Sequence, residues 1–336
     1  MAVTLHPVQF GAANGLQKDV LLLGELLVDC FADREVIGGA PFNVARHLRG
    51  LGRYVGFDPM LVSRIGKDER GARILEKMQA ADLAIDGIQQ DLLRPTGQVQ
   101  VMLDSASKTH QFDILPEQAW DFIHADMAHL IGLLRRPKWL YFGTLAQRGN
   151  SRTALRTLLH TTHALAFLDL NLRDPWVRKD VLHWSLGKAE IVKMNADELD
   201  RITDLLGLPG PTQKAQGERL IENYGLRQLL VTEGAQGAWL LDADNHFFHT
   251  QTPTQTQKPE IEVEVEVEVV DSVGAGDAFS AAFLIGLMQS WPIEQTLNRA
   301  HHFAGEICRI RGAVPDSDAF YQPFIAEWQL AREVNQ

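Results

Sequence analysis

The chain has few cysteines and no long hydrophobic run. Only Cys30 and Cys308 occur among its 336 residues, and neither belongs to a CxxC pair. This spacing excludes a disulfide framework and a cysteine-based zinc site, and it favours a cytoplasmic protein. No apolar run approaches the roughly 20 residues of a membrane span. Residues 1–19 also lack the basic and apolar parts of a signal peptide, so we expect neither export nor membrane insertion.

An excess of positive charge is lacking as well. The formal net charge is −11, whereas nucleic-acid binding relies on clustered Lys and Arg that displace counterions from phosphates. We therefore expect no nucleic-acid partner, and any phosphate ligand must be bound locally. A GxxxxGK sequence followed by Ser or Thr is absent too, which excludes a P-loop kinase.

Short apolar runs alternate with helical segments along most of the chain. Asn43–Leu51 has an apolar face, and Asp68 is a predicted N-cap for the next amphipathic helix. This alternation predicts an α/β fold with a doubly wound, mostly parallel sheet flanked by helices. The runs typical of buried parallel strands are Val20–Gly24, Lys138–Phe142, Ala166–Leu170, Ile191–Met194 and Gln228–Thr232.

Three stretches depart from this alternation of strands and helices. Residues 30–40 and 94–115 include short runs that predict a small antiparallel β-sheet, which is compatible with a lid over a cleft or with a plain edge hairpin. Glu260–Val270 alternates strictly between acidic and apolar residues and predicts one strand with a solvated acidic face, not a metal site. Residues 1–18 are predicted to be an N-terminal extension.

The strongest chemical signal is the sequence from Asp271 to Phe279, between the alternating segment and an apolar helix. Gly274, Ala275 and Gly276 leave backbone N–H groups uncovered at a helix N-terminus, where unpaired donors and the helix dipole attract a phosphate. Asp277 follows in the first helical turn, where its carboxylate could accept a proton from a hydroxyl. The pattern favours phosphoryl transfer over a plain strand-to-helix turn.

A second glycine-rich segment supports this interpretation. Gly38 and Gly39 precede a predicted helix that contains Asn43, and they permit close approach of the backbone to a ligand. Asp29 follows the first strand, so carboxylate and amide groups suited to sugar hydroxyls are expected nearby. Each of these residues taken alone is also typical of a turn or a cap.

These two segments resemble the two motifs of the PfkB/ribokinase family of carbohydrate kinases, in a fructokinase-like form. The resemblance extends from about Asp19 to Pro315, and it implies one ribokinase-like kinase domain over residues 19–330 that uses ATP and Mg²⁺. It implies that Asp277 is the catalytic base and that Gly274, Ala275 and Gly276 form the anion hole. It also implies that the small sheet is a lid through which two copies could form a homodimer.

Further site residues follow from the same resemblance. Arg173 would supply positive charge to the transferring phosphoryl group, and Asn195 and Glu198 would help to hold Mg²⁺, largely through water. Asn195 and Glu198 also have the spacing of a helix capping box, and the two interpretations are compatible. The other matching positions are Asp29, Gly38, Gly39 and Asn43 for the sugar, Asn171, Lys193, Thr232, Gly234 and Gly237 for the nucleotide, and Asp271, Val273 and Gly312 for a K⁺ ion.

Other functions remain open from the sequence. A dinucleotide-dependent oxidoreductase is disfavoured, because Phe279 stands where the dinucleotide fingerprint needs a small residue. A non-catalytic sugar-binding or regulatory protein on the same fold is the alternative of another class. Within the kinases, fructose is the first candidate substrate, and 2-keto-3-deoxygluconate, ribose or a nucleoside are the alternatives.

Overall fold

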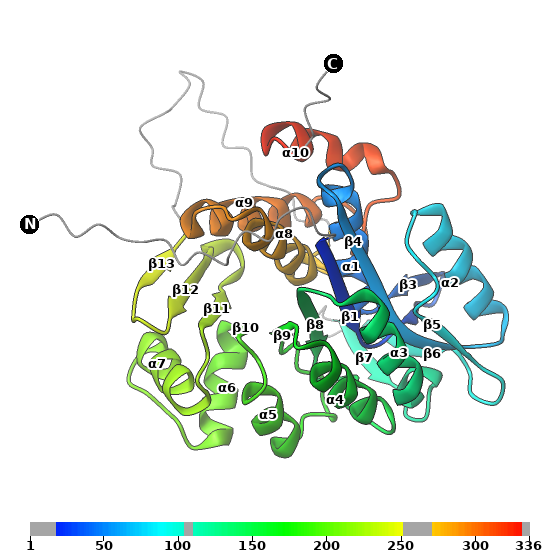
Figure 1. Cartoon of the computed structure of the whole chain (residues 1–336), viewed down its shortest axis with the longest axis horizontal. Helices are drawn as coiled ribbons and strands as arrows, with labels where there is room; N and C mark the ends of the chain where they lie inside the picture. Colours follow the sequence, from blue (N-terminus) through cyan, green and yellow to red (C-terminus); the bar gives the residue numbers. More distant parts are fainter. Residues whose placement is uncertain (1–17, 104–109, 251–270, 331–336) are drawn as a thin grey trace, which may run out of the picture.

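The computed structural model describes residues 18–103, 110–250 and 271–330. The predicted strand Glu260–Val270 and nearly all of the predicted N-terminal extension lie outside these ranges. Within them the chain folds around one large sheet with helices on both faces and a smaller sheet to one side (Figure 1).

The large sheet has nine strands in the described part of the chain. All neighbouring strands are parallel except β12 and β13, which add antiparallel pairs at one end. In spatial order the strands are β13 (Phe247–His249), β12 (Ala238–Asp242), β11 (Gln228–Thr232), β10 (Ile191–Asn195), β9 (Leu165–Asp169), β8 (Trp139–Gly143), β1 (Lys18–Leu23), β4 (Phe57–Gly66) and β5 (Ile88–Asp91).

Both faces of this sheet are apolar, as the continuous hydrophobic runs predict. In β1, Val20 and Leu22 enter one buried cluster, whereas Leu21 and Leu23 enter the cluster on the opposite face. Helices α1 (Ala40–Gly52), α2 (Glu69–Ala80), α8 (Ala275–Gln289), α9 (Ile293–Ile307) and α10 (Gln322–Glu327) cover the first face, and α3 (Ala125–Arg135), α4 (Ser151–Thr162), α5 (Lys179–Leu186), α6 (Ala196–Leu206) and α7 (Gln213–Tyr224) cover the second. The doubly wound architecture is therefore confirmed.

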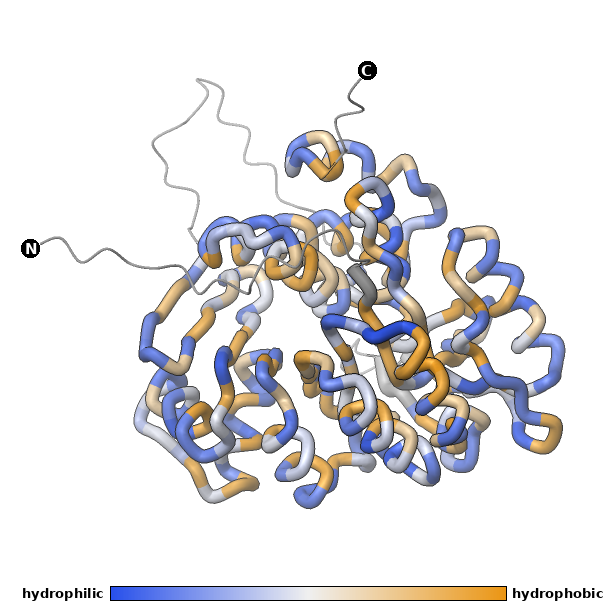
Figure 2. The backbone as a smooth tube through the Cα atoms, in the orientation of Figure 1, coloured by the Kyte–Doolittle hydropathy of each residue, from blue (hydrophilic) through white to orange (hydrophobic). Residues whose placement is uncertain are grey.

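Most helices are amphipathic, and Figure 2 shows hydrophobic and hydrophilic residues alternating along their turns. Helix α8 is different, because every residue from Asp277 to Met288 is buried. It lies between α1 and α9 and packs against both (Figure 1). A helix that is enclosed on all sides presents only its N-terminus to a ligand, and that end carries the motif singled out in the sequence.

The smaller sheet contains four strands and corrects one expectation. Its β2–β3 and β6–β7 pairs are antiparallel, but β2 and β6 run parallel, so the sheet is mixed and not wholly antiparallel. A cluster that includes Leu27, Val99, Trp120 and Leu145 packs beneath it. Its order is β3 (Glu35–Gly38), β2 (Leu27–Cys30), β6 (Gly97–Leu103) and β7 (His110–Ile114).

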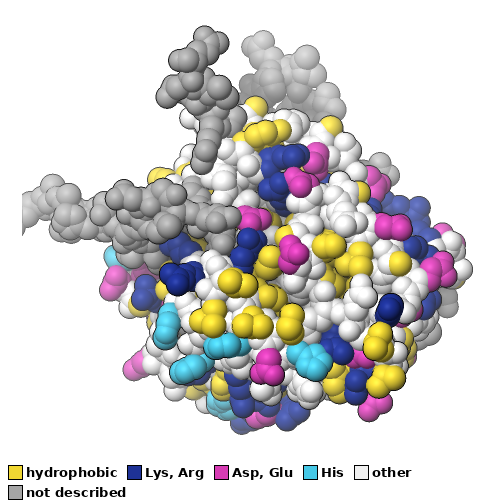
Figure 3. Space-filling model, turned by 45° about the vertical axis from the view of Figure 1, so that its right-hand side comes forward, with side chains coloured by type: hydrophobic (Ala, Val, Ile, Leu, Met, Phe, Trp, Pro, Cys, Tyr) yellow, Lys and Arg dark blue, Asp and Glu magenta, His cyan; other side chains and the backbone are white. Residues whose placement is uncertain are grey.

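Short 3-10 helices complete the elements. The predicted cap of α2 is present, since Asp68 Oδ1 accepts the Gly71 N–H at 2.8 Å. None of the described helices has the length and apolar character needed to cross a membrane. Figure 3 shows basic and acidic side chains interspersed over the face it presents. The 3-10 helices are η1 (Arg53–Val55), η2 (Ala119–Phe122), η3 (Gly234–Gln236) and η4 (Asp318–Tyr321).

Candidate active site

The glycine-rich turn forms an open helix N-terminus. Gly274 is the N-cap of α8 and has φ of 83°, a conformation that favours glycine. The Ala275 N–H contacts Ser272 O only at 3.4 Å, and within the described residues no acceptor is found for the N–H groups of Gly276 and Asp277. Free donors at the positive end of a buried helix are suited to bind a phosphate.

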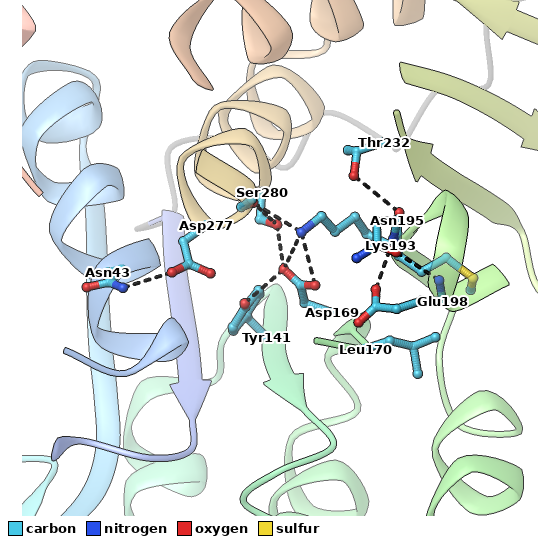
Figure 4. A network of polar contacts seen from close by, with 12 residues as sticks. Asn43, Tyr141, Asp169, Leu170, Lys193, Asn195, Glu198, Thr232, Asp277 and Ser280 are labelled. Carbon is cyan, nitrogen blue, oxygen red and sulfur yellow. Dashed lines mark hydrogen bonds and ion pairs between the residues drawn. The ribbon is translucent and has the colours of Figure 1, made fainter. Parts of the chain in front are cut away.

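Asp277 lies directly beside these amides, in the first turn of α8. The Asn43 side chain, which comes from α1, donates from Nδ2 to Asp277 Oδ2 at 2.8 Å (Figure 4). In the described part of the chain the second oxygen has no hydrogen-bond donor. Burial, followed by the negative charge of Asp169, raises the pKa of Asp277 to about 6. The side chain is therefore a carboxylate at neutral pH with one oxygen free to accept a proton.

The second glycine-rich segment brings α1 close to the end of β1. Gly39 has φ of 112°, and a Cβ atom there would lie 2.4 Å from Glu25 O, so only glycine fits. At Gly38 a Cβ atom would lie 2.8 Å from a carboxylate oxygen of Asp29. These contacts show why both positions lack a side chain: the backbone passes tightly over the segment that carries Glu25 and Asp29.

A cleft of about 740 Å³ opens beside these residues. Asp29, Gly38 and Asn43 contribute to its walls, together with Asp271 and Gly312 from the other side. Burial raises the pKa of Asp29 to about 6, and the positive charge of Arg173 opposes this rise. Three of the four predicted sugar-binding residues thus line one cleft, and Asn43 links that cleft to Asp277.

Arg173 and Asn171 lie in the segment that follows β9. The Arg173 guanidinium donates to Leu172 O at 3.2 Å, and its positive charge also lowers the pKa values of Glu25 and Asp277, which burial raises. Asn171 has φ of 42° and lines a small cavity of about 10 Å³ with Glu25 and Asp169. Arg173 is therefore an exposed cation whose charge acts on the carboxylates of the site.

Lys193 lies beneath the turn that opens α8. It is 6% exposed, and its Nζ atom forms an ion pair with Asp169 and donates to Gly276 O at 3.2 Å. The ion pair joins neighbouring positions of β9 and β10 (Figure 4). The predicted nucleotide contact of this residue stays a prediction, since its described partners all belong to the protein.

The other predicted nucleotide residues lie at the hairpin between β11 and β12. Thr232 ends β11, and its hydroxyl is 3.4 Å from Met194 O. Gly234 and Gly237 have φ of 57° and 113°, and a Cβ atom on Gly237 would meet Thr250 Oγ1 at 2.0 Å. Since β11 is next to β10 in the sheet, this hairpin borders the Lys193 side of the site.

Asn195 and Glu198 form the predicted capping box of α6. Asn195 Oδ1 accepts the Glu198 N–H at 2.8 Å, and Glu198 Oε2 accepts the Asn195 N–H at 2.9 Å. Glu198 Oε1 also accepts the Leu172 N–H at 2.6 Å, which ties the Arg173 segment to α6. The carboxylate keeps further lone pairs for a water, so this donor set fits a hard cation bound through its hydration shell.

Asp271, Val273 and Gly312 come together behind the turn. Asp271 Oδ1 accepts the Val273 N–H at 3.0 Å, and Oδ2 accepts the Gly312 N–H at 3.1 Å. Gly312 has φ of 86°. The carboxylate therefore joins the segment before α8 to the segment after α9.

Sequence reasoning assigned no role to Glu25 or Asp169. Both are buried carboxyl groups at the carboxyl ends of parallel strands, and Tyr141 and Ser280 donate to Asp169 at 3.2 and 2.8 Å. Burial raises the pKa of Glu25 to about 7. An acidic residue directly at the end of an apolar strand is the signal that could have singled them out.

The fold and this site define a class of protein: a phosphotransferase that acts on a small-molecule hydroxyl. A carboxylate stands beside unpaired amides at a helix N-terminus, on the carboxyl edge of a doubly wound sheet. The sequence model of the pfkB family of carbohydrate kinases matches residues 12–319. The chain belongs to this family and is an ATP-dependent carbohydrate kinase.

Individual relatives are similar over nearly the same length. A fructokinase of Escherichia coli is 28% identical over 293 residues, covering 81% of this chain and 85% of that protein. An ATP-dependent 6-phosphofructokinase of Thermoanaerobacterium thermosaccharolyticum is 24% identical and covers 89% and 90%. The crystal structure of a Xylella fastidiosa fructokinase with bound ATP has the same fold, with a TM-score of 0.75 at 21% identity over 94% of this chain and 100% of that one.

Proposed function

We propose that the protein transfers the γ-phosphoryl group of ATP to a hydroxyl of a small sugar, with fructose as the first candidate. The observation that carries this proposal is the Asp277 carboxylate, with one oxygen bound by Asn43 and the other free beside two unpaired amides. The similarity to fructokinases of Escherichia coli and Klebsiella pneumoniae, each at 28% identity, favours fructose.

The reaction would proceed by in-line displacement at the γ-phosphorus. The sugar hydroxyl loses its proton to Asp277 as its oxygen bonds to phosphorus, and the bond from phosphorus to the bridging oxygen of ADP breaks. The turn of Gly274, Ala275 and Gly276 would be the anion hole, in which the unpaired N–H groups of Gly276 and Asp277 stabilise the charge on the phosphoryl oxygens. Arg173 would add positive charge, which already acts on Glu25, Asp29 and Asp277.

Binding roles follow from the cleft and the strand ends. Asp29, Asn43 and the backbone at Gly38 and Gly39 would hold the sugar, since Asp29, Gly38 and Asn43 line the cleft and Asn43 also binds Asp277. The nucleotide would lie along Asn171 and the β11–β12 hairpin, with Thr232, Gly234 and Gly237 next to the adenosine. The cysteines are unpaired, which supports a cytoplasmic location.

Mg²⁺ would be held through water by Asn195 and Glu198. Its chemistry, when bound, is to neutralise charge on the phosphate oxygens of the nucleotide. The residues already fix one another and Leu172, so the ion would bind to a carboxylate whose orientation is set in advance.

A K⁺ site at Asp271, Val273 and Gly312 is a separate prediction. Both carboxylate oxygens of Asp271 already accept a backbone N–H, so these two contacts account for an aspartate at this position without a bound ion. If K⁺ binds there, activity should be higher in potassium than in sodium buffers of equal ionic strength. Equal rates in the two buffers would reject this site.

A coupled assay of ADP release over a sugar panel tests the main proposal. The panel contains fructose, ribose, 2-keto-3-deoxygluconate, a nucleoside and fructose 6-phosphate. Asp277→Ala should abolish sugar-dependent ADP release while sugar binding, measured by calorimetry, stays near that of the unmodified protein. Asp126→Ala is the matched control, since Asp126 also lies in the first turn of a helix but is exposed on α3. Unchanged ADP release in Asp277→Ala would reject the mechanism.

A further inference from the structure

A buried ion pair lies under the candidate anion hole. Asp169 and Lys193 are 1% and 6% exposed, and Lys193 Nζ is 3.1 and 3.0 Å from the two carboxylate oxygens. The residues face each other because they are paired positions on the parallel strands β9 and β10, whose side chains point to the same side of the sheet. A buried lysine is unusual in this strand, because the other buried residues of β10, Ile191, Val192 and Met194, are all apolar.

Stability alone does not explain this pair. Removing two charges from water is costly, and replacing a buried ion pair by apolar side chains of similar volume is often neutral or stabilising. The site also takes up two further donors, Tyr141 Oη and Ser280 Oγ, which approach the Asp169 carboxylate at 3.2 and 2.8 Å. This cluster of polar side chains at an otherwise apolar sheet indicates a role in the turn that lies above it.

The pair touches the turn at one carbonyl group. Lys193 Nζ donates to Gly276 O at 3.2 Å, and Ser280 Oγ lies 3.0 Å from the same oxygen (Figure 4). The Gly276 carbonyl and the Asp277 N–H belong to one planar peptide unit, and in a trans peptide they point in opposite directions. Holding the carbonyl toward Lys193 therefore holds the Asp277 N–H toward the open side of the turn.

The ammonium also contributes charge to the same place. It lies behind the first turn of α8, where its positive charge lowers the pKa of Asp277 and so opposes the negative charge of Asp169, which raises it. Gly276 leaves no space for more than a hydrogen atom here, since a Cβ atom would lie 2.9 Å from Lys193 Nζ. Close approach of the cation to the turn thus depends on the glycine above it.

We propose that Lys193, held by Asp169, is a positioning residue that aligns the Gly276–Asp277 peptide unit and supplies positive charge behind the anion hole. It acts through this peptide, because its described partners, Asp169 and Gly276, both belong to the protein. This inference rests on the proposed function, because in that function the turn binds the terminal phosphate of ATP.

Lys193→Met tests the proposal, with Arg64→Met as the matched control. Arg64 forms a partly buried ion pair with Asp91 at 2.9 Å, at the β4–β5 edge of the sheet. We expect kcat of Lys193→Met to fall by at least about tenfold, short of the roughly hundredfold or larger loss that follows deletion of an oxyanion donor itself. KM for the sugar should stay within about twofold, because Lys193 does not line the sugar cleft.

A binding measurement separates this inference from the proposed function. Lys193→Met should weaken the affinity for a non-hydrolysable ATP analogue more than the affinity for ADP, because the analogue alone carries the terminal phosphate. If the unmodified protein phosphorylates no sugar of the panel, the proposed function fails, whereas the ratio of the two affinities still tests the role of Lys193. An unchanged ratio would overturn the inference, and so would a loss of kcat no larger than that in Arg64→Met.

If Lys193→Met does not fold, the double variant Lys193→Met with Asp169→Asn takes its place. It removes both charges and so leaves no unpaired carboxylate in the core. The inference expects this variant to fold and still to show reduced kcat and a reduced affinity ratio, because the Gly276 carbonyl has lost its ammonium donor. Normal kcat and a normal affinity ratio in the folded double variant would overturn it.

Discussion

At the scale of single residues, the site is dominated by carboxyl groups that the fold has removed from water. Glu25 Oε1 accepts the Ala40 N–H at 3.2 Å, and Oε2 has no hydrogen-bond donor among the described residues. Burial raises the pKa of Glu25 from 4.5 to about 7. The native state therefore keeps this proton to a higher pH than the unfolded chain does, so ionising Glu25 costs stability as the pH rises from about 4.5 to about 7.

Glu25→Gln should stabilise the protein at alkaline pH. The ionised carboxyl is absent from the variant, so the free energy of unfolding at pH 8 should rise by about 3 kcal/mol. Near pH 4.5 the difference should be small, since native Glu25 is protonated there. Urea denaturation at the two pH values measures this, and a difference between the proteins that does not depend on pH would contradict it.

Activity should fall on the acid side because Asp277 must be ionised to accept a proton. With a pKa of about 6, ionisation is nearly complete at pH 7 and lost below pH 6. We expect kcat/KM to drop by about tenfold from pH 7 to pH 5. Asp29 and Glu25 take up protons in the same pH range and would make the loss of activity with falling pH steeper. A flat profile of ADP release down to pH 5 would argue against Asp277 as the base.

Gly274→Ala should damage the turn itself. The φ of 83° disfavours a side chain, and a Cβ atom would lie 2.4 Å from that of Ala313. We expect a loss of about 1–3 kcal/mol in unfolding free energy together with reduced affinity for the ATP analogue. Gly305→Ala is the control, since Gly305 is exposed on α9 and a Cβ atom there meets nothing within 4 Å. Equal effects of the two substitutions would show that the turn tolerates alanine.

At the scale of elements, helix α6 starts at a capping box that also fixes the segment carrying Arg173. We expect Glu198→Gln to raise the Mg²⁺ concentration needed for half-maximal activity by about tenfold, because a neutral amide binds a hard cation less well. Thr212→Ala removes the N-cap of α7, where the Thr212 hydroxyl accepts the Ala215 N–H at 3.2 Å. It should cost about 1 kcal/mol without changing the Mg²⁺ dependence. A similar change in Mg²⁺ dependence in both variants would show that Glu198 acts only as a helix cap.

The sequence predicted most elements of the large sheet because buried parallel strands are continuous apolar runs. The run Gln228–Thr232 coincides with β11, and Asn43–Leu51 lies within α1. The parallel β2–β6 pair was not foreseen, because a four-residue strand carries too little pattern to choose its partner. The same limit applies to the site: the motifs placed Asn43 and Asp277 near a ligand, but no pattern reveals that residues 234 apart share a hydrogen bond.

At the scale of the whole molecule, the four-stranded sheet is linked to the segment after β9 that carries Arg173. Trp176, from the segment after β9, donates from Nε1 to Ile114 O at 3.2 Å on β7, and the Arg148 guanidinium stacks between Trp120 and Trp176. We propose that this sheet is the lid of the domain that spans residues 19–330. Whether two copies pair through it is a further prediction, which sedimentation at several protein concentrations tests.

Sugar binding should therefore protect the small sheet. We expect amide hydrogen exchange in β2, β3 and β6 to slow when the sugar substrate is added, whereas exchange in β8–β11 should change little, because those strands are already enclosed by helices. Hydrogen exchange with mass spectrometry, with and without the sugar, measures both. Equal protection in the two sheets, or none in the smaller one, would contradict closure.

The position of α8 between α1 and α9 also sets the order in which the protein can mature on the ribosome. Phe42, Val44 and Leu48 of α1 are almost wholly buried in the cluster that α8 completes, yet α8 begins only at Ala275. For most of translation this apolar face has therefore emerged from the ribosome without the helix that covers it. The Asp277 carboxylate and the Asn43 amide that binds it are 234 residues apart, so their hydrogen bond can form only after residue 277 has left the ribosome.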